Sequence, residues 1–231
     1  MMMIVENGVV AIIGLGQLGE LLSKRVQASR LLLVSSDERK SSRLAAEIPG
    51  AEPGSEKRLH EASVVVMALP AHTLIPYYEV VSQHLSSGTL LVNPATLIST
   101  EQLRKVCPKH TWIGMKLLGS VKELSTGKRG ILITDSPAYL EMLQALFSPL
   151  GTVLAGDEDW VASCNRIATY HALEACLRIE ADIRRLGIPE ELIYAAQTTV
   201  AKGILQSYPD GTLGHFGKTV LDQVLADRRN A

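Results

Sequence analysis

The chain has 231 residues, of which 46% are hydrophobic and 20% charged, as in an ordinary globular protein with one large or two small domains. Its formal net charge of −1 gives no electrostatic reason to expect nucleic acid or an anionic membrane as a partner. No apolar run approaches the roughly 18 residues of a membrane span, and the start, MMMIVENG, lacks the features of a secretory signal. With three cysteines and no C-x-x-C spacing, we expect a cytoplasmic protein with reduced thiols and no metal site.

A glycine-rich turn follows the first apolar run. The run VVAII, at residues 9–13, is typical of a buried parallel strand, and the next residues, GLGQLG, have G-x-G-x-x-G spacing before a helical pattern begins. In such a turn the first glycine allows the sharp bend, the second lets a pyrophosphate approach the backbone, and the third lets the helix pack closely. We therefore predict a dinucleotide site at Gly14, Leu15, Gly16, Gln17, Leu18 and Gly19. The alternative is a turn with a purely structural role.

The second predicted strand, LLLV, ends in the polar segment SSDERK. Ser35 and Ser36 stand where an NAD-selective site places an acidic side chain for the ribose 2′-hydroxyl. These hydroxyls, with Arg39 and the lysine after it, suit a 2′-phosphate because they donate hydrogen bonds and neutralise its charge. We therefore predict NADP (NADPH) in preference to NAD. Two alternatives stay open: Asp37 can serve as a ribose acid, and the segment can be a solvated turn that opens the next helix.

Strands and helices continue to alternate up to residue 155. Apolar runs predict further strands at residues 64–69, 89–92, 112–115, 130–134 and 152–155. The ends of such strands line the crevice in which open α/β sheets bind ligands. We therefore expect Ala68, Leu69 and Pro70 to line the dinucleotide and Asn93 to lie near its nicotinamide. The alternative role of Asn93 is that of a turn-former before a proline.

The pattern changes after Asp157. From there to Leu186 the sequence has no glycine or proline and its apolar residues recur at helical spacing, which predicts a helix on the order of 40 Å long. Gly187 is a typical stop signal, Pro189 a typical start for the next helix, and residues 218–228 have the pattern of a last amphipathic helix.

Together these patterns predict an α/β fold with two domains. Residues 1–156 are expected to form a Rossmann-type NAD(P)-binding domain with a doubly wound, mainly parallel sheet. Residues 157–231 are expected to form a small all-α domain. The apolar stripe on its long helix favours a homodimer through the C-terminal helices. The other expected partner is a small-molecule substrate, with neither nucleic acid nor a membrane.

Catalytic residues stay unassigned at this stage, because the sequence has no Ser-His-Asp order, no metal-ligand spacing and no G-x-S-x-G segment. His171 and Glu174, three apart on the long helix, can face the cofactor, although a lone histidine among apolar neighbours more often serves packing. Tyr170 and Lys116 are isolated residues that can donate a proton or bind a carboxylate. Hydride transfer needs little from the protein beyond orientation and electrostatics, so this weak signature is compatible with a reductase.

Several segments carry a family resemblance: GLGQLG, SSDERK, VVVMALP, ISTEQL, WVAS and, most specifically, GIPEELIYAAQTTVAKGI. In these segments the chain resembles the pyrroline-5-carboxylate reductases, and especially their late-competence-protein relatives. The resemblance implies an N-terminal NADPH-binding domain and a C-terminal helical domain that interlocks with its copy in a dimer. It also implies the reduction of a cyclic imine, pyrroline-5-carboxylate, to proline.

The family's substrate motifs are altered in this chain. Around residues 167–171 the glycine and proline of an S-G-P-A-like motif are missing, and MKLL at residues 115–118 replaces an M-P-N-like motif. The S-P-G-G-T-T loop, which binds substrate in the family, has no clear counterpart, since PDGT at residues 209–212 comes too early. We therefore expect an NADP-dependent oxidoreductase for a small cyclic imine or carbonyl with an altered or missing imine site. The alternative is a non-catalytic, NADPH-binding regulatory protein.

Overall fold

The computed structural model describes residues 8–229. The prediction that the chain lacks a secretory signal rests on MMMIVENG, most of which lies outside the described residues. The chain divides into two compact units, residues 1–166 and 167–231. The boundary predicted after residue 156 lies at the start of the long helix, whereas this division falls within the same helix. Within residues 8–229, none of the helices is both long and apolar enough to cross a bilayer.

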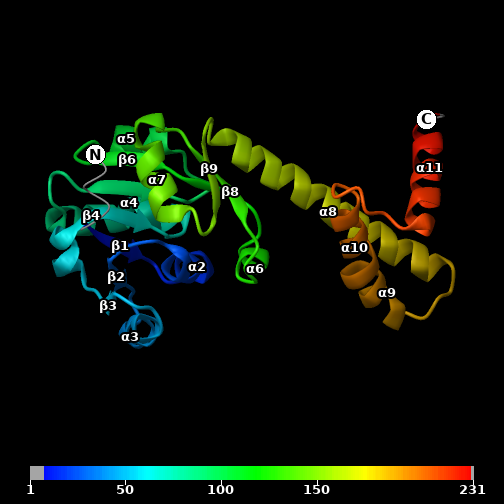
Figure 1. Ribbon diagram of the computed structural model, residues 1–231, viewed down its shortest axis with the longest axis horizontal. Helices are drawn as coiled ribbons and strands as arrows, with labels where there is room; N and C mark the ends of the chain where they lie inside the picture. Colours follow the sequence, from blue (N-terminus) through cyan, green and yellow to red (C-terminus); the bar gives the residue numbers. More distant parts are fainter. Residues whose placement is uncertain (1–7, 230–231) are drawn as a thin grey trace. The chain divides into compact units, whose positions relative to one another are not determined.

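Parallel strands form the main sheet of the first unit. The strands are β1 (Val9–Ile13), β2 (Arg30–Val34), β3 (Ala51–Pro53), β4 (Ala62–Met67), β5 (Leu90–Asn93) and β6 (Thr111–Gly114). Their order is β3-β2-β1-β4-β5-β6, and every neighbouring pair is parallel (Figure 1). The chain order reverses between β1 and β4, which makes this point the topological switch at which doubly wound sheets bind ligands.

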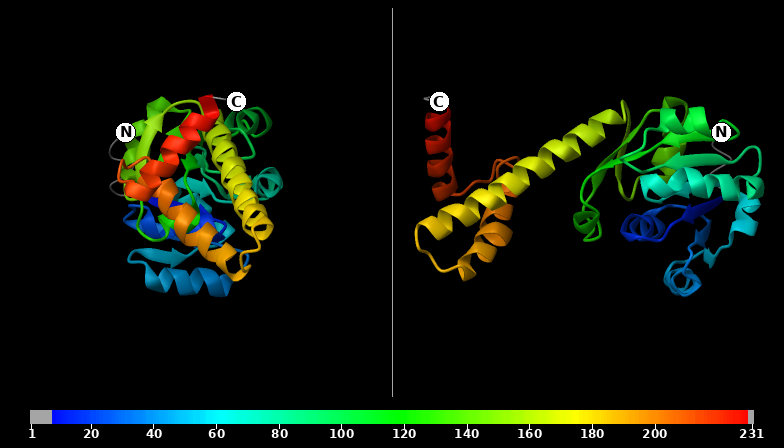
Figure 2. Two further views of the ribbon diagram at one scale, coloured as in Figure 1. Left: turned by 90° about the vertical axis from the view of Figure 1, so that its right-hand side faces the viewer. Right: turned by 180° about the vertical axis from the view of Figure 1, so that it is seen from behind.

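Alternate residues of each strand pack on opposite faces of the sheet. Val10 and Ile12 of β1 belong to one apolar core, and Val9 and Ile13 to the other. The first core includes residues of α2 (Gln17–Arg25), α3 (Glu38–Glu47) and α7 (Leu140–Phe147). The second includes residues of the 3-10 helix η1 (Glu56–Glu61), α4 (Ala71–Val81) and α5 (Thr100–Val106). Helices therefore cover both faces, as the views in Figure 1 and Figure 2 show.

The last strands of the unit form a second sheet, instead of extending the first as predicted. Its strands are β7 (Lys116–Leu118), β8 (Gly130–Thr134) and β9 (Gly151–Ala155), in the order β7-β8-β9. The chain bends after β7 at Gly119, where φ is 153°, and passes through α6 (Val121–Leu124). Because β8 then returns antiparallel to β7, only β8 and β9 keep the parallel arrangement. Short 3-10 helices complete the unit: η2 (Ser82–His84) and η3 (Pro137–Tyr139).

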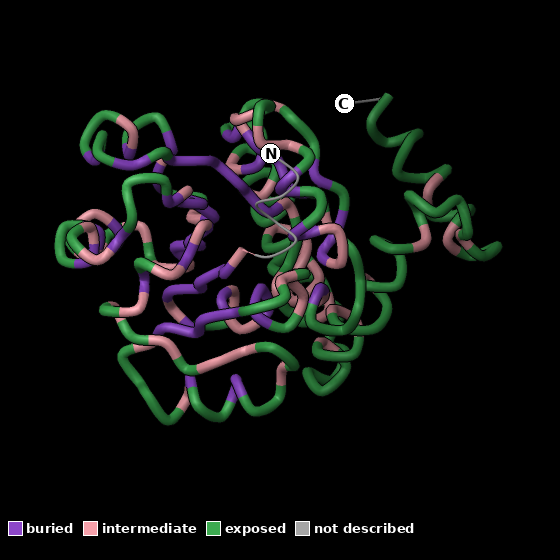
Figure 3. Tube along the Cα trace, turned by 60° about the vertical axis from the view of Figure 1, so that its left-hand side comes forward, coloured by how far each residue is buried: buried purple, intermediate pink, exposed green. Residues whose placement is uncertain are grey.

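The second unit is helical, as predicted. Its elements are most of α8 (Asp159–Arg185), then α9 (Glu191–Ala195), the π-helical η4 (Ala196–Ala201), α10 (Lys202–Ser207) and α11 (His215–Arg229). None of the residues 167–229 is buried, and Val161 is the buried residue of α8. In Figure 3 the chain near the C-terminus is accordingly green and pink, whereas purple follows the strands. A Rossmann-type sheet followed by a helical part confirms the predicted fold class.

A buried histidine packs beneath the second face of the main sheet. His110 is 5% exposed, and its Nδ1 lies 2.9 Å from the hydroxyl of Tyr78. Tyr78 also contacts the ring of Trp112, with centroids 5.4 Å apart. Burial, and next the charge of Lys109, hold the pKa of His110 below its usual value, against an opposing effect of the backbone at Ser86 and Leu85.

This lowered pKa predicts a pH-dependent stability. In the unfolded chain the histidine titrates near pH 6.5, so on acidification the unfolded state binds the proton first. The contribution of His110 should be complete above that pH and lost as the pH falls through the lower pKa of the folded state. Urea unfolding at pH 7.5 and at lower pH should show that the unfolding free energy of His110→Phe falls less with decreasing pH than that of the wild-type protein. The exposed His72 provides the control, His72→Phe, and equal pH slopes in all three proteins would contradict the prediction.

Candidate functional site

The glycines of the turn after β1 have different surroundings. Gly14 has a φ of 87°, and a Cβ there would lie 2.5 Å from the carbonyl oxygen of Ala68. A Cβ on Gly19 would lie 1.8 Å from the carbonyl oxygen of Gly14. A Cβ on Gly16, in contrast, would meet nothing within 4 Å. Close backbone contacts therefore require glycine at the first and third positions, while the second faces open space.

The open space at Gly16 lies at the start of α2. Gly16 is the N-cap of this helix and has no side chain with which to accept hydrogen bonds from the first backbone N–H groups. The N-terminal end of a helix also carries a partial positive charge. This open backbone with uncapped donors fits a pyrophosphate, which is the group predicted to bind here. Of the neighbouring predicted residues, Gln17 is exposed, Leu18 is partly buried, and Leu15 is buried in the core.

Cationic side chains surround a small hollow after β2. It has a volume of about 230 Å³ and is lined by Asp37, Arg39, Lys40 and Arg43. Asp37 is the N-cap of α3, and its Oδ1 accepts hydrogen bonds from the backbone N–H of Arg39 at 3.0 Å and of Lys40 at 3.2 Å. One oxygen of the alternative ribose acid is thus already used to begin a helix.

The remaining groups of this segment are open to ligand. Ser36 and Arg39 are exposed, and Ser35 is partly exposed, although its hydroxyl accepts a hydrogen bond from the backbone of Asp37 at 3.2 Å. Within residues 8–229, Arg39 has no carboxylate at ion-pair distance, whereas Lys40 lies 3.9 Å from Glu20. The segment therefore offers an unpaired guanidinium and hydroxyls, which are suitable donors for a phosphate.

The end of β4 lies against the glycine turn. The pairing of β1 with β4 places Ile13 opposite Met67, and the following residues, Ala68 and Leu69, lie where a side chain on Gly14 would collide with them. Ala68 and Leu69 are partly exposed, and Pro70 is exposed as the N-cap of α4. The structure thus brings these predicted residues together with the glycine turn.

Asn93, at the end of β5, is fully buried. Its Nδ2 donates to the carbonyl of Ile98 at 3.1 Å and to Oγ1 of Thr100 at 3.0 Å, and its Oδ1 accepts from the backbone N–H of Ala95 at 3.0 Å. The side chain therefore holds the turn that follows β5, which is the alternative role considered from the sequence. Contact between Asn93 and a nicotinamide stays a prediction.

A buried ion pair lies beside this turn. Lys116 of β7 is 2% exposed, and its Nζ lies 3.4 Å from Oε2 of Glu158 and donates to the carbonyls of Ala95 and Ile98. Burial lowers the pKa of Lys116, against the opposing effect of Glu158. Sequence reasoning noted Lys116 as an isolated residue and missed Glu158. The signals were a lysine within an apolar run and an acidic residue just before the long helix.

The two sheets are joined by a second charged pair. Arg104 of α5 donates to both oxygens of Asp135, from Nη1 at 2.7 Å and from Nη2 at 3.1 Å. Asp135 also accepts from the backbone N–H of Gly114 at 2.9 Å. Although burial acts to raise it, hydrogen bonds from Arg104, Ser136 and Gly114 hold the pKa of Asp135 below its usual value. The pair ties the end of β6 to the end of β8.

Of the groups singled out on α8, Tyr170 and His171 are exposed in the single chain and Glu174 is partly exposed. Nδ1 of His171 lies 3.3 Å from Oε2 of Glu174, whose Oε1 accepts from Arg178 at 2.7 Å. The rings of Tyr170 and His171 are 5.3 Å apart and perpendicular. These residues form a small cluster that includes the hydroxyl of Tyr170, a group that can donate a proton. In the described part of the chain, no three His, Cys, Asp or Glu side chains gather as a metal site requires.

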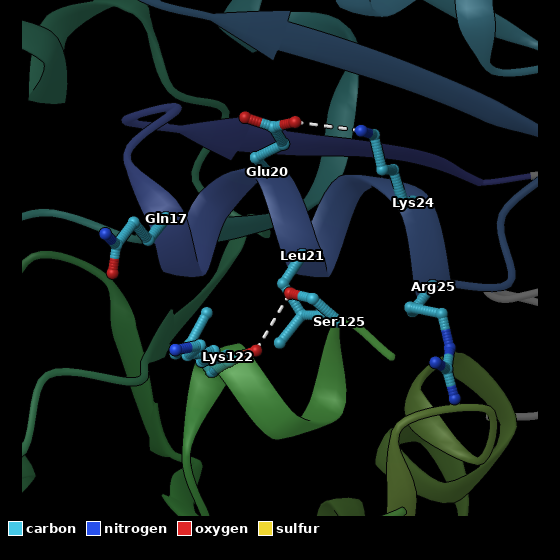
Figure 4. Close-up of a pocket in the computed structure, with 8 residues that line it drawn as sticks. Gln17, Glu20, Leu21, Lys24, Arg25, Lys122 and Ser125 are labelled. Carbon is cyan, nitrogen blue, oxygen red and sulfur yellow. Dashed lines mark hydrogen bonds and ion pairs between the residues drawn. The ribbon is translucent and has the colours of Figure 1, made fainter. Parts of the chain in front are cut away.

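A further hollow, of about 540 Å³, lies between α2 and α6 (Figure 4). The side chains that line it are Gln17, Glu20, Leu21, Lys24, Arg25, Val121, Lys122 and Ser125. Glu20 and Lys24 pair with each other at 2.8 Å, and Arg25 donates to the backbone carbonyls of Leu124 and Pro149. Its charged groups are thus largely occupied or exposed to solvent, and its geometry selects no ligand.

Comparison with known protein families gives a match to part of the chain. Residues 9–96 match the family described as "NADP oxidoreductase coenzyme F420-dependent". The matched segment runs from β1 to just beyond β5 and so includes all the predicted cofactor residues. No curated protein matches the chain.

Solved structures show the same fold at low identity. A Plasmodium falciparum pyrroline carboxylate reductase with NADP bound has a TM-score of 0.62 and 14% identity, over 98% of this chain and 92% of that one. A Myxococcus stipitatus imine reductase variant with NAD+ has a TM-score of 0.61 and 18% identity, over 97% and 78%. A Mycobacterium tuberculosis 3-hydroxyisobutyrate dehydrogenase has a TM-score of 0.60 and 17% identity, over 84% and 71%. At these identities the likeness establishes the fold alone.

Proposed function

We propose that the protein binds NADPH and acts as an NADP-dependent oxidoreductase on a small cyclic imine or carbonyl. The observation that carries the proposal is the open space at Gly16 before the uncapped start of α2, between two glycines that backbone contacts fix. The match of residues 9–96 to an NADP oxidoreductase family supports it, as does the NADP bound to the similar Plasmodium falciparum reductase.

Each predicted residue has a role in this proposal. The backbone of the segment from Gly14 to Gly19 and the N-terminus of α2 hold the pyrophosphate. Ser35, Ser36 and Arg39 hold the 2′-phosphate. Ala68, Leu69 and Pro70 line the dinucleotide, and the turn held by Asn93 lies further along the same edge of the sheet. Bound NADPH would supply the hydride, so the protein would need only to position the substrate, shield the site from water and polarise the bond that is reduced.

The substrate pocket differs from that of the pyrroline-5-carboxylate reductases in this proposal. Besides the altered motifs, Lys116 is buried and its Nζ is engaged with two carbonyls and Glu158. All contacts of this amine are therefore internal, and it does not bind a substrate carboxylate. His171 and Tyr170, which are exposed, are the remaining candidates for a proton donor.

We propose that the C-terminal helices dimerise with a second copy. Residues 167–229 bury no side chain, although a stable helical unit needs an apolar core. Exposed large apolar residues in this unit include Leu173, Leu177, Leu186, Leu192, Val200, Leu205 and Phe216. An exposed apolar surface of this extent marks an interaction site, and a helix pair of identical chains covers it symmetrically.

The cofactor proposal is tested first at the glycines. Gly16→Val should leave the melting temperature nearly unchanged, since nothing lies within 4 Å of the new Cβ, but should abolish NADPH binding by filling the pyrophosphate position. Gly19→Ala should instead destabilise the fold by about 1–3 kcal/mol or more through backbone overlap. Calorimetry with NADPH and thermal unfolding measure the two effects. Unchanged affinity of Gly16→Val for NADPH would contradict the proposed cofactor site.

The preference for NADP is tested at Arg39. Replacing it by alanine should weaken NADPH binding by about 1.5–3 kcal/mol, the size of a charge-assisted contact, and should leave NADH binding nearly unchanged. The control is Arg129→Ala, which removes an exposed cation elsewhere. Titrations of NADPH and NADH with the wild-type protein, Arg39→Ala and Arg129→Ala measure this preference. Equal losses for NADPH and NADH would favour Asp37 as a ribose acid.

The dimer is tested at two exposed leucines of α8. Leu173 and Leu177 line an apolar hollow of about 470 Å³. Sedimentation should give about twice the chain mass of 25.0 kDa, and Leu173→Glu with Leu177→Glu should abolish association because unpaired charges are costly to bury. Leu177→Met, which keeps the apolar character, should remain dimeric. A stable wild-type monomer at micromolar concentration would refute the interlocked helices.

The altered imine site predicts little or no conversion of pyrroline-5-carboxylate to proline. Each missing charge-assisted hydrogen bond to the substrate carboxylate costs about 1.5–3 kcal/mol, and about 1.4 kcal/mol corresponds to tenfold in rate. The assay follows NADPH oxidation and proline formation. Turnover near an ordinary value of about 10 per second would contradict the altered site. NADPH binding without turnover on a panel of other imines and carbonyls would support the regulatory alternative.

A further inference from the structure

The loop after β5 is closed by one ammonium group. Nζ of Lys116 donates to the carbonyl of Ala95 at one end of the loop and, at 3.0 Å, to the carbonyl of Ile98 at the other. The side chain of Asn93 joins the same two ends through the N–H of Ala95 and the carbonyl of Ile98. Residues 96 and 97 between them are exposed, and Leu97 is 90% exposed. The loop is therefore fixed at its ends and presents its middle to solvent.

Glu158 holds this ammonium in place. It is 8% exposed and lies 3.4 Å from Nζ of Lys116. It also accepts hydrogen bonds from the backbone N–H of Thr100 and, at 2.8 Å, from its hydroxyl. A buried lysine needs such a counter-charge, because an isolated charge is costly to bury. The pair thus joins the loop, the first residue of α5, strand β7 and the residue before α8.

The loop lies on one side of the glycine turn and the cationic hollow on the other. In the sheet order, β2 is next to β1 on one side, and β4 and then β5 follow on the other. Neighbouring strands are about 4.8 Å apart, so the end of β5 is roughly 10 Å from the end of β1. A dinucleotide whose pyrophosphate lies at Gly16 and whose 2′-phosphate lies near Arg39 therefore extends its other half towards this loop.

We propose that Lys116, with Glu158 as its counterion, is a positioning residue for the nicotinamide half of the cofactor. It acts by holding the backbone of residues 95–98 in the shape that this half contacts. Its own ammonium touches no ligand, because the side chain is 2% exposed and its donors are engaged. The inference rests on the proposed binding of NADPH.

The test compares the whole cofactor with its adenosine half. Calorimetry is performed with NADPH and with 2′,5′-ADP, which has the 2′-phosphate but no nicotinamide. Lys116→Met should weaken NADPH binding about tenfold or more, as expected when a positioned group is displaced, and should leave 2′,5′-ADP binding unchanged. The emission of bound NADPH should also shift, since its nicotinamide environment changes. Lys105→Met is the matched control, because the Lys105 side chain is 72% exposed on α5.

Lys116→Met leaves Glu158 without its counterion, so this variant can fold poorly. A second variant keeps the inference testable in that case. The double variant Lys116→Met with Glu158→Gln removes both charges and should show the same selective loss of NADPH. Equal losses for NADPH and 2′,5′-ADP would overturn the inference, because Lys116 would then act through general stability. Unchanged binding of both ligands would overturn it as well. If the wild-type protein bound neither ligand, the proposed cofactor function itself would fail.

Discussion

The close contact between the glycine turn and β4 fixes the geometry on which the proposed cofactor site depends. A side-chain carbon on Gly14 would overlap the backbone at Ala68, and one on Gly19 would overlap Gly14 itself. These contacts seat the first turn of α2 directly on the sheet, so its unpaired N–H groups face outward at the switch point. Gly16 is free of such contacts, so the fold itself would accept a side chain there, and in the proposed function its open space holds the pyrophosphate.

Charge is used differently at the two ends of the proposed cofactor site. Near β2, Arg39 is exposed and has no carboxylate within ion-pair distance in the described part of the chain, so it can exchange water for a phosphate. Near β5, Lys116 and Glu158 are buried and neutralise each other. An exposed cation contributes affinity for an anion, whereas a buried pair contributes a fixed shape. Arg39 therefore suits binding at one end of the site, and the pair of Lys116 and Glu158 suits positioning at the other.

The sequence predicted those elements whose residues form apolar runs of four or more residues or a long helical pattern. The strands at residues 130–134 and 64–69, and the helix beyond Asp157, lie close to the observed β8, β4 and α8. Strands β3 and β7 and helix α6 were missed, because three residues are too few for a strand pattern and the four residues of α6 make only about one helical turn. The second sheet and the pairing of Lys116 with Glu158 depend on contacts between distant residues. Likewise, the cap that Asp37 provides for α3 competes with a ligand role that spacing alone also allows.

The helical unit adds a constraint of its own. Residues 167–229 bury no side chain in the single chain, so in the proposed dimer the apolar burial that stabilises these helices comes from association. Folding of this unit then depends on protein concentration, whereas the first unit has two apolar cores of its own. Heating or dilution should therefore unfold the helices of the second unit before the sheet of the first unit unfolds. In the proposed dimer, each copy would keep its cofactor site when dissociated but lose whatever the ordered helices contribute to the reaction.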